Sequence, residues 1–393
     1  MTEKKAYVDY GAGTPVDPRV LEVMKPYFTR SFGNPSSGHS MGQEAKKAVE
    51  MARSSVAELV GAEMKEEIIF TSGATESNNL AIKGVAHRNM TRGNHLITTT
   101  IEHMSVINTL KYLQRGGFET TYVPVDEYGI VDVEALKNAI TDQTILISVM
   151  YANGEIGTIQ PIKEIGEIAH ERNVYFHVDA VAAAGQVPIN VIGEHMDLLS
   201  LSSNDLYGPK GVGALYVKTG TKIQPIVHGG GQERGMRSGT ENVPAVVGMG
   251  EAARVAKREL SSESVRLSGL RDRLIAGVLD KIPHSFLNGH PSKRLPNNAN
   301  LRFSYIEGES LILSLDMEGV STSSGSACTS KTLEPSHVLL AIGLAHEAAH
   351  GSLVFTLGRW TTKEEIDYVV KILPGIVRRL RAISPLTPKE LLR

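Results

Sequence analysis

Short apolar runs of β type alternate with helical patterns over most of the chain, and this alternation limits its fold more than any other feature. Strands are expected at Glu67–Thr71, His95–Thr100, Glu119–Val125, Thr144–Tyr151, Val174–Asp179, Met196–Ser202 and Gly213–Val217. Helices are expected between most of them, at Glu44–Val60, Glu76–Asn89, Met104–Gln114, Val133–Ile140 and Ile162–Arg172. Such alternation predicts an α/β fold with a mainly parallel central sheet and helices on both faces. Ligands of these folds bind at the carboxyl ends of the strands, so residues just after each strand are the first candidates for a site.

The pattern changes near residue 255. A long helical stretch, Ala252–Lys281, leads there into a more mixed region. The clearest helix is the last one, because apolar residues from Ile366 to Leu380 recur at i, i+3, i+4 and i+7. We therefore expect a large domain formed by residues 17–260. A smaller domain would combine residues 1–16 with residues 261–393.

The chain of 393 residues contains one cysteine, Cys328. This count excludes a disulfide within the chain and any Cys-rich zinc or iron–sulfur site built by one chain alone. It also favours a reducing compartment, and we expect a cytoplasmic protein. The formal net charge is −2, so bulk binding to nucleic acid or to an anionic membrane is not expected. Neither a signal peptide nor a transmembrane helix is expected, because no sufficiently long apolar run is present.

Three positions or segments that follow expected strands are candidates for chemistry. The turn from Thr71 to Glu76 opens a helix, and its N–H groups with the Thr75 hydroxyl can cradle a phosphate or simply cap the helix. His103 can stack on a flat ring, or it can be bonded near a helix start. Asp179 ends a buried strand and needs a partner, which can be a protonated pyridine nitrogen, an arginine or backbone N–H groups.

Two polar segments add further candidates. Residues 228–240 are rich in glycine and contain two arginines, so this segment contacts a phosphate or is a mobile loop. Cys328 lies in the loop Ser323–Ser330, which consists mostly of small polar residues. Free cysteines are usually buried and inert. A loop of Ser, Gly and Ala gives little apolar cover, however, so we expect an accessible and reactive thiol.

Together these residues strongly resemble the IscS/NifS-type cysteine desulfurases, which are pyridoxal 5′-phosphate (PLP) proteins of fold type I in the class V aminotransferase family. The resemblance runs nearly from end to end. It is carried, in the same order, by Asp9-Tyr10, Thr14–Pro18, Phe32–Ser37, Thr71–Asn79, Glu102-His103, Val178–Ala180, Tyr207–Gly211, Arg237–Thr240, Ser323–Thr329 and Leu357–Arg359. It implies a large domain with a mainly parallel seven-stranded sheet and a smaller α+β C-terminal domain.

The resemblance implies how the cofactor phosphate would be held. Ala74, Thr75 and Ser202 would bind it within one chain. Thr240 would reach it from the second subunit of a homodimer.

The resemblance also implies roles at the ring and at the substrate. His103 would stack on the cofactor ring, and Asp179 would pair with the pyridine nitrogen. Asn34 and Arg359 would hold the carboxylate of L-cysteine. Cys328 would take sulfur from that cysteine as a persulfide and pass it to an IscU-type scaffold protein for iron–sulfur cluster assembly.

The chain departs from the family at the lysine that forms the Schiff base with PLP. The family carries His-Lys just before its x-Tyr-Gly-Pro-Lys-Gly segment, whereas this chain has Asn204 and Asp205. Gly154 and Ala182 replace the family's Asn and Gln near the ring oxygen. A carboxylate cannot do the covalent work of a lysine. Asp205 would also add negative charge beside the phenolate oxygen of the cofactor.

Two functions are compatible with these residues. In the first, the protein is an enzyme that binds PLP noncovalently or weakly and converts L-cysteine to L-alanine. In the second, it is a non-catalytic assembly partner whose Cys328 accepts sulfur or ligates iron in a cluster shared with the scaffold. Lys210 is a candidate replacement for the missing lysine, although the family has this lysine in addition to the Schiff-base one. Another PLP reaction, such as transamination, needs the same lysine and does not explain Cys328.

Overall fold

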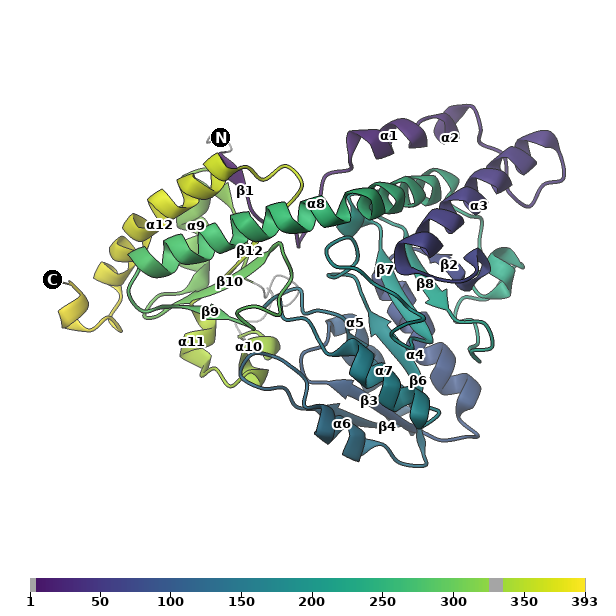
Figure 1. The fold of residues 1–393 in the computed structure, drawn as a ribbon, viewed down its shortest axis with the longest axis horizontal. Helices are drawn as coiled ribbons and strands as arrows, with labels where there is room; N and C mark the ends of the chain where they lie inside the picture. The colour runs from purple at the N-terminus through teal and green to yellow at the C-terminus, as the bar shows by residue number, and fades with distance from the viewer. Residues whose placement is uncertain (1–4, 325–334, 393) are drawn as a thin grey trace.

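The computed structural model describes residues 5–324 and 335–392. Its largest element is a seven-stranded sheet with the order β2-β8-β7-β6-β5-β3-β4 (Figure 1). The bounds in that order are β2 (Ile68–Thr71), β8 (Gly213–Val217), β7 (Leu198–Ser202), β6 (Tyr175–Asp179), β5 (Thr144–Met150), β3 (His95–Thr99) and β4 (Glu119–Val123). All neighbouring strands are parallel except β8, which is antiparallel to both β2 and β7. The predicted α/β fold with a mainly parallel sheet is confirmed.

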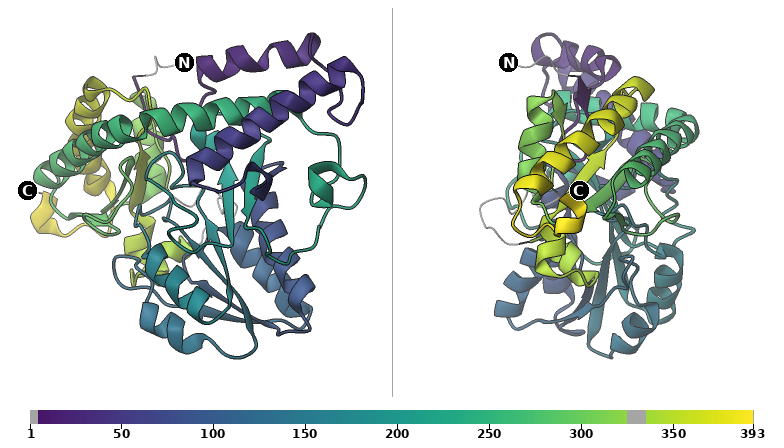
Figure 2. Two further views of the ribbon diagram at one scale, coloured as in Figure 1. Left: turned by 45° about the vertical axis from the view of Figure 1, so that its right-hand side comes forward. Right: turned by 90° about the vertical axis from the view of Figure 1, so that its left-hand side faces the viewer.

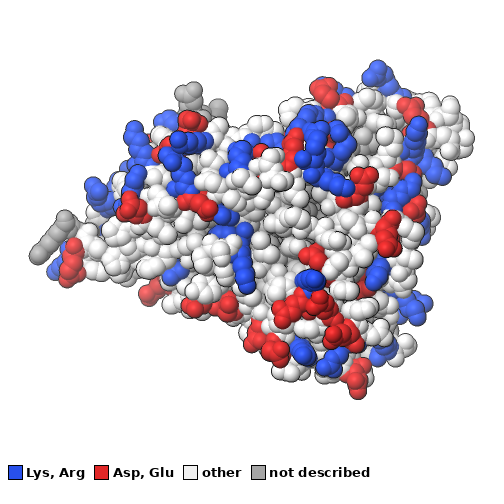
Figure 3. Space-filling model, viewed as in Figure 1, with Lys and Arg blue, Asp and Glu red and all other residues white. Residues whose placement is uncertain are grey.

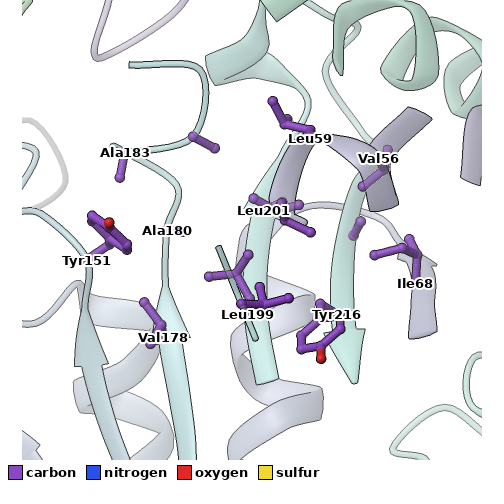
Figure 4. Packing of buried hydrophobic residues seen from close by; sticks show 14 of the residues in the cluster. Val56, Leu59, Ile68, Tyr151, Val178, Ala180, Ala183, Leu199, Leu201 and Tyr216 are labelled. Carbon is purple, nitrogen blue, oxygen red and sulfur yellow. The ribbon is translucent and has the colours of Figure 1, made fainter. Parts of the chain in front are cut away.

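Helices cover both faces of this sheet, because its strands carry apolar side chains on both sides. In β7, the Leu198 side chain lies in the core on one face of the sheet and the Leu199 side chain lies in the core on the other face. The first face is covered by α4 (Ala74–Asn89) and α5 (Met104–Arg115). Figure 4 shows the packing on the opposite face around β6, β7 and β8. The helices that contribute there are α1 (Pro18–Met24), α3 (Ser40–Val60), α6 (Val133–Ala139), α7 (Ile162–Glu171) and the first half of α8 (Val243–Lys281).

A second core surrounds a three-stranded antiparallel sheet with the order β12-β10-β9. These strands are β12 (Ser352–Thr356), β10 (Asn298–Phe303) and β9 (Ser285–Asn288). They pack with α9 (Gly308–Met317), α12 (Lys363–Ile383) and the second half of α8. The N-terminal strand β1 (Ala6–Tyr7) pairs with β11 (Val320–Ser321) and buries Ala6 and Val8 in this core. The N-terminus therefore packs with the C-terminal part of the chain.

Helix α8 connects the two cores, as Figures 1 and 2 show from three directions. It begins nine residues before the expected start at Ala252, with the Asn242 side chain capping it. The glycines in this first part prevented its prediction as a helix, because glycine has low helix propensity. The structure explains why glycine is used: a Cβ at Gly250 would collide with the backbone of Ala52 on α3. Close packing of α8 on α3 thus outweighs local propensity.

The remaining elements are short. The helices are α2 (Pro26–Thr29), α10 (His337–Ala341) and α11 (His346–His350). The 3₁₀ turns are η1 (Lys65–Glu67), η2 (Asn204–Leu206), η3 (Gln232–Gly235) and η5 (Lys389–Leu392). Acidic and basic side chains are interspersed over the face seen in Figure 3, without a patch of a single sign large enough to suggest a polyanionic partner. Within the described ranges, no helix is long and apolar enough to cross a membrane.

A buried ion pair fixes the glycine-rich segment 228–240 against α3. Arg53 donates two hydrogen bonds to Glu233 at 2.6 and 2.8 Å, and both side chains are buried. Glu233 also accepts the N–H of Phe70 on β2 at 2.9 Å. Glu233 and Arg234 both adopt positive φ angles of 47° and 55°, so the backbone turns sharply where the pair forms. Ion pairing thus holds this segment beside the edge of the large sheet.

We predict that Glu233→Ala destabilises the fold by about 3–5 kcal/mol, because it removes the buried carboxylate partner of Arg53 and leaves only the partly exposed Glu50 to pair with the guanidinium. Arg53→Ala should cost a similar amount. The double variant should cost clearly less than the sum of the two. Urea unfolding of the four proteins measures this coupling, and strictly additive losses would contradict the prediction.

Candidate active site

A cavity of about 560 Å³ lies at the carboxyl ends of the strands in the large sheet. Residues that follow β2, β3, β5, β6 and β7 line it, as the sequence predicted for this fold class. Its other side is lined by the N-terminal residues Asp9–Ala12 and Thr14 and by residues of the sheet in the second core, such as Asn298 and Val354. The lining includes Asp9, Thr14, Ser72–Glu76, Glu102-His103, Asn153–Glu155, Asp179, Ala182, Ser202, Asn204-Asp205, Ser323, Ser336-His337 and Thr356.

The turn between β2 and α4 presents a helix N-terminus to the cavity. Ala74 and Thr75 line it, and α4 has no side-chain cap. The N–H groups of a first helical turn have no partner within the helix, so they are available to an anion. Gly73 has a φ of 150°, a conformation that side chains rarely adopt. Ser202, at the end of β7, lines the same cavity.

The segment 228–240 reaches this helix N-terminus through one arginine. Arg237 donates hydrogen bonds to both carboxylate oxygens of Glu76, at 2.8 and 3.3 Å. Glu76 lies in the first turn of α4 and lines the cavity. Arg237 therefore has a carboxylate partner beside the candidate phosphate cradle.

His103 is bonded at a helix start, one of the two alternatives considered for it, and it also lines the cavity. It caps α5, with its Nδ1 atom accepting the N–H of Ser105 at 3.2 Å and lying 2.8 Å from the Ser105 hydroxyl. The cap fixes the imidazole at the cavity wall, where a flat ring can pack on it.

Asp179 is buried at the end of β6 and is held by neutral donors. One carboxylate oxygen accepts the Asn78 amide at 2.7 Å, and the other accepts the N–H of Val181 at 3.1 Å. Asn78 also donates to the Ser105 hydroxyl at 2.8 Å, which links α4, α5 and β6 behind the cavity. No cation pairs with Asp179 among the ion pairs of the described residues, so a cationic ring nitrogen would complete its environment.

Gly154, Ala182, Asn204 and Asp205 all line the cavity. A Cβ placed on Gly154 would lie 3.5 Å from the Cβ of Ala182, and both residues line the cavity with Asp205. Desolvation raises the pKa of Asp205 to about 6, with nearby Asp179 adding to the effect and Ser202 and Asn204 partly offsetting it. These residues therefore contribute to the wall of the same cavity.

Lys210 does not reach the cavity. Its Nζ donates to the carbonyl oxygen of Thr14 at 2.8 Å, and the residue is exposed. Asn204 binds the same N-terminal segment, because the Thr14 hydroxyl donates to the Asn204 carbonyl. The described lining of the cavity therefore contains no lysine.

The remaining predicted site residues lie outside the described lining of the cavity. Arg359 forms an ion pair with Asp17 and stacks 4.6 Å from the ring centroid of Tyr207. Asn34 and Thr240 are exposed. Cys328 lies outside the described residues.

Two buried carboxyl groups at strand ends were not assigned a role from the sequence. Glu102 accepts the Thr99 hydroxyl at 2.7 Å and the N–H of Met150 at 3.0 Å, while its second oxygen has no partner in the described structure. Burial raises the pKa of Glu102 to about 8. Burial also raises the pKa of Glu155 to about 7, although the Ser336 hydroxyl donates to it at 2.8 Å. Their position in the sequence could have indicated them, since each follows an expected strand by a few residues.

Comparisons with known proteins agree along the whole chain. The model of the aminotransferase class-V family matches residues 6–369. The chain is 58% identical to cysteine desulfurase IscS 1 of Archaeoglobus fulgidus over 97% of this chain and 99% of that protein. It is 56% identical to cysteine desulfurase IscS of Methanosarcina thermophila over 99% of this chain and 96% of that protein. A solved NifS-like protein matches with a TM-score of 0.90 and 39% identity over 96% of this chain and all of that chain. SspA, solved in complex with cysteine, matches with a TM-score of 0.81 and 38% identity over 91% of this chain and all of its own.

We predict that Glu102→Gln changes how stability depends on pH. Below pH 4.5 the carboxyl group is protonated in both the folded and the unfolded chain, so its titration contributes nothing. Between pH 4.5 and about 8 only the unfolded chain releases the proton, and wild-type stability falls as pH rises. The glutamine variant lacks this term, so its stability relative to wild type should rise by ~2–4 kcal/mol between acidic and mildly alkaline pH.

Urea unfolding of both proteins across this pH range provides the measurement. The exposed Glu127→Gln serves as the matched control and should show no such trend. A pH-independent difference between Glu102→Gln and wild type would contradict the prediction.

Proposed function

Because this chain belongs to the aminotransferase class-V family, we propose that it is a cysteine desulfurase-type protein that supplies sulfur for iron–sulfur cluster assembly. The observation that carries the proposal is the convergence of three groups on one cavity. They are the N-terminus of α4, the His103 ring and the Asp179 carboxylate. A phosphorylated pyridine ring needs an anion site, a flat contact and a partner for its nitrogen, and this wall offers each of them.

The described residues fit PLP bound without a covalent bond. The first turn of α4 with Thr75 and Ser202 suits the phosphate, His103 suits the ring face and Asp179 suits the protonated nitrogen. The cavity volume of about 560 Å³ falls among those of small-molecule sites. When bound, PLP supplies an electron sink for reactions of amino acids. The absence of a lysine from the described lining favours noncovalent binding.

In the proposed reaction, L-cysteine and the Cys328 thiol give L-alanine and a Cys328 persulfide. The carbon–sulfur bond of the substrate breaks and a sulfur–sulfur bond forms; one of the two thiol hydrogens ends on the new methyl group of alanine and the other on the persulfide. No oxidant is needed. Asn34 and Arg359 would hold the substrate carboxylate, and Arg359 would then exchange or share its partner Asp17.

The partners follow from the same proposal. The protein would act as a homodimer, in which Thr240 of one chain approaches the phosphate site of the other. The exposure of Thr240 and its distance from the described lining of its own cavity support this arrangement. The persulfide on Cys328 would pass to an IscU-type scaffold protein.

A second candidate function is favoured by Asp205. A carboxylate at the lysine position leaves no covalent anchor, and Lys210 is bound to Thr14 instead. The protein would then be a non-catalytic assembly partner. Cys328 would accept sulfur or contribute one ligand to an iron–sulfur cluster shared with the scaffold, because each chain has one cysteine.

The test compares wild type, Asp205→Lys and Lys210→Ala after incubation with PLP. We expect wild type and Lys210→Ala to lose PLP on dialysis, whereas Asp205→Lys should retain it in a form that borohydride reduces. With saturating PLP, wild type should release alanine from L-cysteine roughly 10²–10⁴-fold more slowly than Asp205→Lys. Cys328→Ala should not form the persulfide, which mass spectrometry detects.

Absence of alanine with wild type at saturating PLP would exclude the desulfurase and leave the second candidate. That candidate is tested by cluster assembly on the scaffold from supplied iron and sulfide. It fails if Cys328→Ala leaves the assembly rate unchanged.

A further inference from the structure

Gly154, Ala182 and Asp205, three of the positions at which the sequence differs from the family pattern, line the same cavity. Gly154 follows β5, Ala182 follows β6, and Asp205 lies in η2 after β7. The Cβ positions of the first two residues are 3.5 Å apart, and both are small. The wall beside Asp205 has therefore lost two amide side chains as well as a lysine, which makes room for a group on the ligand.

The charge of the cavity has changed with its shape. Six carboxylic side chains are among its described lining residues: Asp9, Glu76, Glu102, Glu155, Asp179 and Asp205. Among the same residues there is no lysine or arginine, and Glu76 already has Arg237. One oxygen of the fully buried Glu102 has no partner in the described structure. An aspartate in place of a lysine changes the formal charge by two units, so a ligand that brings its own positive charge is favoured.

No fixed cation of the described chain neutralises Asp205. Its neighbours Ser202 and Asn204 are neutral, and Asp179 is a like charge. Lys210, the nearby lysine in the sequence, is bound to the Thr14 carbonyl instead. A partly buried carboxylate in this situation gains most from a ligand cation with N–H donors.

We propose that Asp205 converts the lysine position into a receptor for a primary ammonium group beside the bound pyridine ring, an inference that rests on the proposed PLP site. The ammonium group supplies the positive charge and the N–H donors that the wall lacks. It can come from the aminomethyl group of pyridoxamine 5′-phosphate or from the α-ammonium of an amino acid bound next to the ring. Asp205 thus binds an amine where the family's lysine supplies one.

Ligand binding without turnover tests this inference. Pyridoxamine 5′-phosphate and pyridoxine 5′-phosphate differ only by an aminomethyl group in place of a hydroxymethyl group, so their affinities isolate the ammonium group. We expect isothermal titration calorimetry at neutral pH to show about tenfold tighter binding of the amine form, a factor equivalent to ~1.4 kcal/mol. Asp205→Asn should abolish this preference. The exposed Asp142→Asn removes the same net charge and should keep it.

A second experiment tests whether an amino acid supplies the ammonium group. L-Cysteine is titrated into protein saturated with pyridoxine 5′-phosphate, which has no aldehyde to react. Binding that weakens about tenfold in Asp205→Asn supports an α-ammonium ligand. Asp205→Ser serves as a second variant, and thermal unfolding checks that each variant is folded.

Equal affinity for the amine and alcohol forms, together with cysteine binding that is absent or independent of Asp205, overturns the inference. Different results overturn the ammonium receptor and the proposed function. Alanine formation without an ammonium preference overturns only the inference. An intact ammonium preference, with no alanine and no dependence of cluster assembly on Cys328, overturns only the proposed function.

Discussion

The carboxyl ends of the parallel strands meet at one edge of the large sheet, and the site depends on this constraint. Residues that follow β2, β3, β5, β6 and β7 come from distant parts of the sequence, yet they share one cavity. Two cores hold that edge in place, and α8 contributes to both of them. Because the sheet is buried on both faces, its polar groups at this edge are partly desolvated. Burial therefore decides which of these polar groups have pKa values far from their usual range.

Desolvation acts most strongly on the carboxyl groups. It raises the pKa of Glu102 to about 8 and that of Asp205 to about 6. Asp179 is stabilised as a hydrogen-bond acceptor by the Asn78 amide and a backbone N–H. A pocket of this kind suits a ligand with positive charge on its ring nitrogen and on an amine. The proposed noncovalent cofactor site and the proposed ammonium receptor both follow from that balance of charge.

Several predictions from the sequence depended on periodicity and composition, and their success varied for physical reasons. The inner parallel strands β3, β5 and β6 of the large sheet were located from apolar runs because strands buried on both faces are rich in apolar residues. The start of α8 was placed too late because Gly250 lowers helix propensity, while the contact with Ala52 that requires glycine is tertiary. His103 was given two alternative roles, and the fold combines the helix cap with a place on the cavity wall. The part played by Glu102 was missed because its burial cannot be read from neighbouring residues.

The sequence by itself determined the α/β class and the family resemblance, and it contains Asp205, Gly154 and Ala182. These features are local or depend on the order of motifs along the chain. Only the tertiary structure decided that these three residues line one cavity and that Lys210 is bound to Thr14 instead of lining it. It also decided that Arg359 pairs with Asp17. Such contacts join residues far apart in sequence, so their distances and desolvation exist only once the sheet and the two cores have formed.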